Sequence, residues 1–185
     1  MESELSKFRK GKMLRYYLLG FIDAEGCFSV SLKKQETTRF GWVLDPVFQV
    51  TQHNDHREIL DMIKSEMSCG RVMPKPGQED CLIFVVDNRR QLIEKVVPFF
   101  ENYKPIAKKR DFEAFKNIVF GLERKEHADK ESFRRLIETA FKMNSEGKQR
   151  RYALHEVLES LEKQTGSSET VRQTPKGDDT VRLSQ

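Results

Sequence analysis

Two acidic residues, Asp23 and Glu25, stand at the junction between a predicted helix and a predicted strand. The C-terminal end of a helix carries partial negative charge, so carboxylates placed there require a compensating cation or hydrogen-bond donors. Carboxylate oxygens are hard ligands that suit Mg²⁺, and a metal site is therefore one interpretation of the pair. The other is a surface acid pair that ends an ordinary core helix, and composition alone favours this second interpretation.

Two small residues, Gly20 and Ala24, lie four positions apart on the helix that leads to these acids. Residues four apart share one helix face, and small side chains there allow a second helix to approach closely. The helix is predicted from Met13 to Ala24, because apolar residues recur at three- and four-residue spacing. Gly26 is predicted to end it, since glycine is favoured just beyond a helix.

Strands must follow this helix, because the hydrophobic period changes to two. From Cys27 to Gln35 apolar and polar residues alternate, so one face would be buried and the other would be polar and partly basic. A second predicted strand is interrupted at Asp45-Pro46. The predicted strands cover residues 27–35, 42–51, 71–75 and 81–86.

Helices account for the remaining regular structure. They are predicted over residues 55–69, 91–100, 111–122, 130–143 and 149–161. Four strands with a polar face and helices on the other face make an α+β layer arrangement. The chain is divided into an N-terminal extension (1–12), a core (13–122), C-terminal helices (123–163) and a tail expected to be disordered (164–185).

Composition narrows the function classes. The chain has 185 residues, 34% of them charged, with a formal net charge of +4, a mild basic bias compatible with nucleic acid. Three cysteines without a C-x-x-C pair argue against a disulfide framework or zinc ribbon and favour a reducing interior. No apolar run suggests a membrane span and no secretory signal is visible, so an intracellular location is expected, either bacterial cytoplasm or an organelle such as a chloroplast.

The nine residues LLGFIDAEG, from Leu18 to Gly26, closely resemble the motif of the LAGLIDADG homing endonucleases. Later blocks are similar too, including Phe48–Gln52 and Lys108–Phe112. The blocks at 39–41, 45–46 and 87–89 resemble the subgroup encoded by group I introns of ribosomal RNA genes. The resemblance implies the αββαββα homing-endonuclease fold, with an antiparallel four-stranded saddle that sits in the DNA major groove.

A single copy of the motif implies a homodimer that cuts both strands of a long, near-palindromic DNA target. The motif helices would pack against each other at the two-fold axis. The residues that the resemblance assigns to this interface are Gly20, Phe21, Asp23 and Ala24. The dimer would bring two Glu25 side chains together, whereas one chain alone has only one such acid.

The resemblance also implies divalent-metal-dependent hydrolysis of phosphodiesters. Glu25 matches the metal-ligating acid, with the Ala24 carbonyl as a second ligand. Mg²⁺ is the expected ion, and Mn²⁺ or Ca²⁺ could occupy the same site. Gln52 matches a polar residue that orients water, and Lys108, favoured over Lys109, matches a basic residue that stabilises transition-state charge. Without the motif, these would be an ordinary hydrogen-bonding residue and a solvated basic surface.

DNA contacts are expected on the polar face of the strands. Predicted base-reading residues are Ser29, Ser31, Lys33, Gln35, Gln49, Thr51, Arg71 and Lys75. Arg39, Lys104, Arg110 and Lys116 are expected to contact phosphates, which adds affinity without sequence information. Two alternatives remain open: a non-catalytic nucleic-acid-binding protein such as an intron splicing maturase, and a structural protein whose Gly20 helix only dimerises.

Overall fold

A computed structural model describes residues 11–143 and 151–166. Its elements, in chain order, are α2 (Lys12–Glu25), β1 (Gly26–Lys34), β2 (Trp42–His53), η1 (Asn54–His56), α3 (Arg57–Met67), β3 (Arg71–Lys75), β4 (Gln78–Val86), α4 (Arg89–Gln91), η2 (Leu92–Val96), α5 (Val97–Asn102), α6 (Lys109–Glu123), η3 (Glu126–Ala128), α7 (Lys130–Lys142) and α8 (Leu154–Gly166). The predicted α+β order is confirmed.

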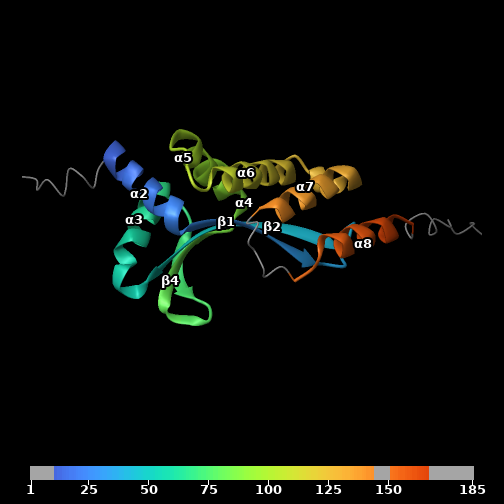
Figure 1. Cartoon of the computed structure of the whole chain (residues 1–185), viewed down its shortest axis with the longest axis horizontal. Helices are drawn as coiled ribbons and strands as arrows, with labels where there is room; N and C mark the ends of the chain where they lie inside the picture. The colour runs from blue at the N-terminus through green and yellow to red at the C-terminus, as the bar shows by residue number, and fades with distance from the viewer. Residues whose placement is uncertain (1–10, 144–150, 167–185) are drawn as a thin grey trace, which may run out of the picture.

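The four strands form one antiparallel sheet in the order β1-β2-β4-β3. Gly26 pairs with Val50, so the end of α2 lies beside the C-terminal half of β2. Helices α5, α6 and α7 lie on one side of the sheet, and β4 curves away from them (Figure 1). The sheet therefore has a covered inner face and a second, outer face.

The alternation predicted for the first strand is confirmed. Phe28 and Val30 are buried on the inner face, whereas Ser29 is half-buried and Ser31 is exposed on the outer face. The interruption predicted at Asp45-Pro46 is wrong, since β2 continues through it. β4 pairs with β2 only from Phe48 onward, so this part of β2 has a single neighbour and tolerates a residue that lacks an N–H.

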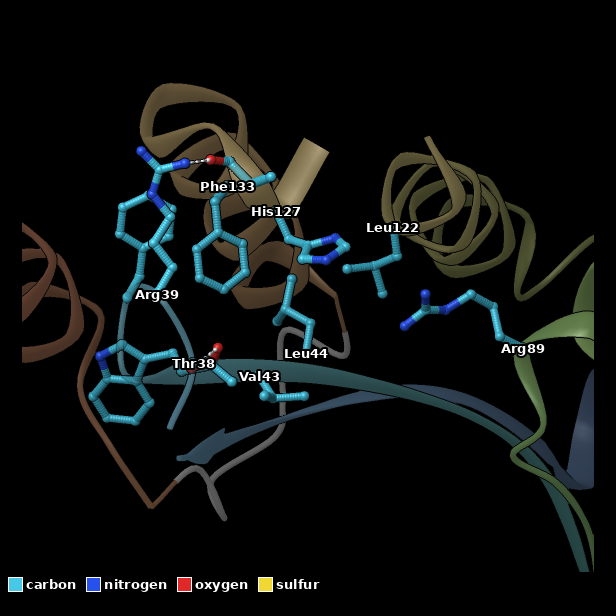
Figure 2. Close-up of a pocket in the computed structure, with 11 residues that line it drawn as sticks. Thr38, Arg39, Val43, Leu44, Arg89, Leu122, His127 and Phe133 are labelled. Atoms are coloured by element: carbon cyan, nitrogen blue, oxygen red, sulfur yellow. Dashed lines mark hydrogen bonds between the residues drawn. The ribbon is translucent and has the colours of Figure 1, made fainter. Parts of the chain in front are cut away.

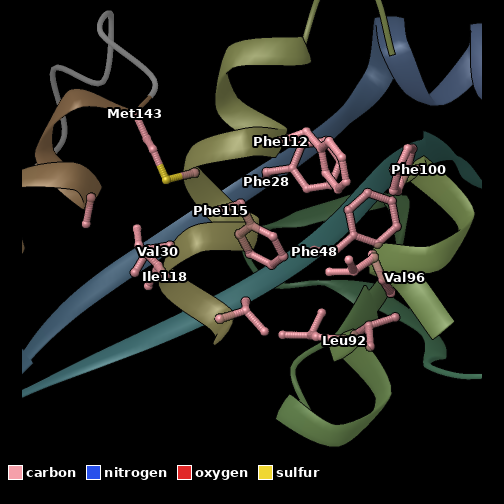
Figure 3. Close-up of a cluster of buried hydrophobic side chains, with 14 of the residues drawn as sticks. Phe28, Val30, Phe48, Leu92, Val96, Phe100, Phe112, Phe115, Ile118 and Met143 are labelled. Atoms are coloured by element: carbon pink, nitrogen blue, oxygen red, sulfur yellow. The ribbon is translucent and has the colours of Figure 1, made fainter. Parts of the chain in front are cut away.

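Five phenylalanines fix the helices to the sheet behind the α2–β1 junction. Phe28 lies at the centre, with ring centroids 4.9 Å from Phe100, 5.2 Å from Phe48, 5.4 Å from Phe115 and 5.5 Å from Phe112 (Figure 3). All five are buried, and edge-on and tilted ring contacts of this kind add to the free energy of area burial. This packing joins the sheet to α5 and α6 and so fixes the position of the residues at the end of α2.

The C-terminal helices extend the core at the far end of β2. Trp42 donates its indole N–H to Ser160 Oγ (2.6 Å) and packs edge-on against Tyr152, which attaches α8 to the sheet. Residues 1–10 of the predicted extension and 167–185 of the predicted tail lie outside the described residues. No helix within the described ranges is long and apolar enough to cross a membrane.

Candidate active site at the end of helix α2

The change from helix to strand occurs at a single glycine. The Gly26 N–H bonds to the Ile22 carbonyl, and a Cβ at this position would lie 2.6 Å from that same carbonyl oxygen. Any other residue would therefore force helix and strand apart. Glu25 is the last residue of α2 and is exposed, and β1 begins at the next residue.

Asp23 has the hydrogen-bond donors that a carboxylate at a helix C-terminus requires. Its two oxygens accept the backbone N–H groups of Ile106 (2.8 Å), Ala107 (2.8 Å) and Lys108 (2.9 Å). Burial raises the pKa of Asp23, but these three amides together outweigh it and the net pKa is lowered. Asp23 therefore fixes the loop that precedes α6, within its own chain.

This loop places one lysine at the tip of α2. The Lys108 ammonium donates to the Ala24 carbonyl oxygen at 3.2 Å. Lys109 is the exposed first residue of α6, and no hydrogen bond or ion pair of its side chain occurs among the described residues. The structure thus brings Lys108 to the Ala24 carbonyl, next to Glu25, although Lys108 lies 84 residues further along the chain.

Gln52 lies at the end of β2, two residues beyond the residue that pairs with Gly26. Its side-chain oxygen accepts the backbone N–H of His53 at 2.7 Å, and its side chain is half-buried. His56, which follows in η1, is exposed. Within the described residues, no group of three or more His, Cys, Asp or Glu side chains is arranged to hold a metal ion.

The predicted base-reading residues differ in where they lie and in whether their side chains already form hydrogen bonds within the chain. Gln49 and Thr51 alternate outward along β2, and Ser29 donates its hydroxyl to the Val47 carbonyl (3.2 Å). Gln35 lies in the turn after β1, where its side chain donates to Thr37 (3.3 Å). Lys75 is half-buried next to a register shift between β3 and β4.

Two acids on the outer face were missed in the sequence. Lys33 forms an ion pair with Asp45, and Arg71 forms a bidentate pair with Asp87. Asp45 could have been found from the sequence. If the second strand is taken as continuous, the alternation of buried and outward residues places Asp45 on the outer face. Asp87 follows directly after β4 and could not be separated from a helix-capping residue by sequence alone.

Arg39 lies at the other end of the molecule from Glu25. It borders a cavity of about 380 Å³ between the start of β2, α6 and α7, where its guanidinium donates to the Ala128 carbonyl at 2.9 Å (Figure 2). His127 Nδ1 is buried there without a partner among the described residues, and burial lowers the pKa of His127. Lys116, another predicted phosphate contact, pairs with Glu113 (2.9 Å).

One face of α2 is largely exposed among the residues that the structure describes. Met13, Tyr16 and Tyr17 are 64%, 52% and 48% exposed, and Gly20 and Ala24 continue the same face toward the tip. A Cβ added at Gly20 would meet nothing within 4 Å. Phe21 differs, since it is half-buried and packs against the core. The open stripe of α2 is thus aromatic at one end and made of small residues beside the acidic tip.

Comparison with known proteins assigns the family. The sequence profile described as LAGLIDADG endonuclease matches residues 18–119. Homing endonuclease I-ApeII of Aeropyrum pernix is 38% identical over 153 residues, covering 80% of this chain and 90% of that protein. DNA endonuclease I-CeuI of Chlamydomonas moewusii is 39% identical over 89 residues, covering 48% of this chain and 41% of that protein.

Solved structures agree with this assignment. The archaeal intron-encoded homing endonuclease I-Vdi141I, complexed with DNA, superposes with a TM-score of 0.77 at 40% identity, covering 82% of this chain and 96% of that one. The group I intron-encoded homing endonuclease I-CeuI, also complexed with DNA, gives a TM-score of 0.76 at 27% identity, covering 82% and 77%. The chain belongs to the LAGLIDADG endonuclease family.

Proposed function

We propose that this protein is a site-specific homing endonuclease that cuts both strands of DNA as a homodimer, with a divalent metal ion as cofactor. The observation that carries the proposal is the contact of Lys108 with the Ala24 carbonyl at the tip of α2, next to the exposed Glu25. An ammonium group and a carbonyl oxygen meet there, adjacent in the chain to an exposed acid. Family membership supports the same activity.

The donor set at this tip fits Mg²⁺. Glu25 is exposed and forms no ion pair within the described residues, so its carboxylate is available. The Ala24 oxygen already accepts a cationic donor from Lys108, which indicates that positive charge is favourable at this point. Both are hard oxygen ligands of the kind that Mg²⁺ prefers, and Mn²⁺ or Ca²⁺ would use the same oxygens. Bound there, the ion would lower the pKa of a water molecule and neutralise charge on the phosphate.

Each side chain at the tip has a distinct task in this proposal. Glu25 and the Ala24 carbonyl would hold the ion. Lys108 would turn from the Ala24 carbonyl toward the negative charge that develops on the phosphate. Gln52 would orient the attacking water through its amide group, which lies at the same end of the sheet. Asp23 takes no part in the reaction, but its three amide contacts hold Lys108 in place.

The open face of α2 supports the dimer. One chain contributes one exposed acid at the tip, and two would be needed to act on both DNA strands. Gly20 and Ala24 leave room for close helix approach, and the exposed Tyr16 and Tyr17 offer apolar area at the other end of the stripe. Two-fold symmetry of the protein would match a near-palindromic target.

The outer face of the sheet would read the DNA. Ser29, Ser31, Gln49 and Thr51 present hydroxyl and amide groups on two neighbouring strands, the groups that recognise base edges in the major groove. Two of the similar solved structures are complexes with DNA, which favours this surface as the binding face. The named relatives are DNA endonucleases, and they favour this function over the maturase alternative.

The test is cleavage by Glu25→Gln. The amide keeps the shape but removes the charge that would hold the ion, so we expect cleavage of plasmids carrying intron-insertion sites to fall by at least about 10³-fold. DNA binding, measured in parallel by gel shift, should stay close to wild type. The control is Glu58→Gln, an exposed acid on α3. Cleavage by Glu25→Gln at the wild-type rate in the presence of Mg²⁺ would contradict the proposal.

A further inference from the structure

On each edge strand of the sheet, one basic side chain forms an ion pair with an acidic residue that stands on, or directly after, the neighbouring inner strand. On β1, Lys33 pairs with Asp45, which stands two residues beyond the residue directly opposite Lys33 on β2. On β3, Arg71 pairs with Asp87, likewise two residues beyond its direct partner on β4. The same diagonal ion pair therefore occurs at both edges of the sheet, on its outer face.

The pair at β3 occupies the atoms of Arg71 that would otherwise recognise DNA. Its two terminal nitrogens donate to the two oxygens of Asp87, at 2.8 and 2.7 Å. A guanidinium reads guanine through two donors that contact O6 and N7. Arg71 cannot use this end-on pair of N–H groups for Asp87 and for guanine at the same time, so an end-on contact with a guanine edge requires that Asp87 release it.

The two ion pairs are close enough across the sheet for Lys33 to act on Asp87. The hydrogen bond from Arg71 is the main cause that lowers the pKa of Asp87, burial opposes it, and the charge of Lys33 adds to the lowering. Asp87 is therefore a carboxylate at neutral pH. Exposed ion pairs contribute little to folding stability, so stability is a weak reason for them. On a face that meets a polyanion, two carboxylates reduce affinity.

We propose that Asp45 and Asp87 are specificity-determining residues of the DNA face, which keep Lys33 and Arg71 from phosphates and wrong bases and release them to a G·C pair. This inference rests on the proposed function. Guanine offers two adjacent acceptors for the cation, and the cytosine opposite offers an amine donor for the freed carboxylate. An A·T pair also offers an amine donor, but only a G·C pair combines that donor with two adjacent acceptors for the cation. A contact with a phosphate leaves the carboxylate unpaired close to the DNA.

The experiment compares the full-length chain with Asp45→Asn and Asp87→Asn. Asparagine keeps the size of the side chain and removes the charge that holds the cation. The matched control is Asp61→Asn, because Asp61 also forms an exposed ion pair, with Arg57 at 3.1 Å, but lies on α3 in the helix layer. Two probes are used: an unselected pool of mixed-sequence duplexes for affinity, and a randomised duplex library for selection and sequencing.

We expect each variant to bind the unselected pool about threefold to tenfold more tightly at low salt, with a salt dependence steeper by about one released counterion per freed cation. The selected consensus should lose its G·C preference at one position in each half-site and stay unchanged elsewhere. Asp61→Asn should match the wild-type chain in both assays.

Other results would overturn the inference. If the pairs only clamp the sheet edges, the variants will bind the pool no more tightly than wild type, and unfolding temperatures will fall. An unchanged consensus would equally refute the inference, with the proposed function intact. If the wild-type chain enriches no sequence and binds the pool without salt dependence, the proposed function itself fails.

Discussion

The two ends of the sheet are held in different ways. Beside Glu25, polar contacts lie in front of the buried phenylalanine cluster: three backbone amides bind Asp23, and an ammonium group binds a carbonyl. Beside Trp42, aromatic side chains are buried against the C-terminal helices, as in the stacked rings of Phe40 and Phe133 (5.9 Å between centroids). The far end is packed against its own C-terminal helices except at the cavity beside His127, whereas the α2 end has an exposed acid and an exposed helix face.

The largest effect is expected from one of two neighbouring lysines at the α2 end. Lys108 reaches the tip of α2 and Lys109 does not, so we expect Lys108→Met to lower the cleavage rate by about 10²-fold or more while DNA binding changes little. Lys109→Met should reduce only salt-dependent affinity. Single-turnover cleavage with saturating enzyme separates the two effects. Equal losses of rate in both variants would mean that the observed contact has no role in the reaction.

The open face of α2 gives the next largest expected effect. Gly20→Leu adds a side chain where the chain itself has free space, and leucine favours the helix, so the monomer should fold at least as stably. A close helix pair would lose roughly 1–3 kcal/mol to overpacking, or about tenfold to a hundredfold in dimer affinity. Sedimentation measures this affinity directly.

A matched glycine inside the chain serves as the control for Gly20. A Cβ at Gly121 would lie 2.7 Å from Leu136 Cδ2 and 2.8 Å from Glu126 Oε2. Gly121→Ala should therefore lower the unfolding temperature and leave the dimer affinity unchanged. Should Gly20→Leu sediment like wild type, the stripe of small residues on α2 is not a contact between subunits.

The sequence predicted the helices and strands of this molecule better than the hydrogen bonds and ion pairs between them. Periodicity located the strands and helices, because burial of one face leaves a regular trace in the chain. The family resemblance predicted Glu25 as a metal ligand and favoured Lys108 over Lys109 as the basic residue, and both stay predictions. The bonds from Asp23 to residues 106–108 left no such trace, since backbone amides look the same in every sequence and only the fold brings that loop to α2. Ion pairs such as Arg71 with Asp87 depend on strand register, which also lies outside local patterns.

A smaller effect is expected from the residue that joins the acidic tip to the loop. Asp23→Ala leaves three backbone N–H groups without their acceptor, which should lower the free energy of unfolding by about 1–3 kcal/mol at neutral pH. Cleavage should fall as well, because Lys108 loses its fixed position. Denaturant titration and the cleavage rate are measured on the same preparation. An unchanged cleavage rate would mean that the position of this loop does not matter for the reaction.

The same variant makes a prediction about pH. The pKa of Asp23 in the folded chain lies below its ordinary value of 3.8, so its contribution to stability is fully present above that value. The contribution is lost as the pH falls through the lower folded-state pKa. The difference in unfolding free energy between wild type and Asp23→Ala should therefore shrink in acid. A difference that stays constant down to low pH would mean that the amide contacts do not depend on the charge.

The smallest expected effect lies at the opposite end of the sheet. Trp42→Phe keeps an aromatic ring against Tyr152 but removes the N–H that bonds to Ser160, a net cost of about 1 kcal/mol in unfolding free energy. Because this end packs against its own C-terminal helices and lies away from the tip of α2, metal-dependent cleavage and dimer affinity should both match wild type once the chain is folded. A lowered cleavage rate at full folding would instead mean that packing of α8 reaches the tip of α2 through β2, and the two ends could no longer be treated as independent.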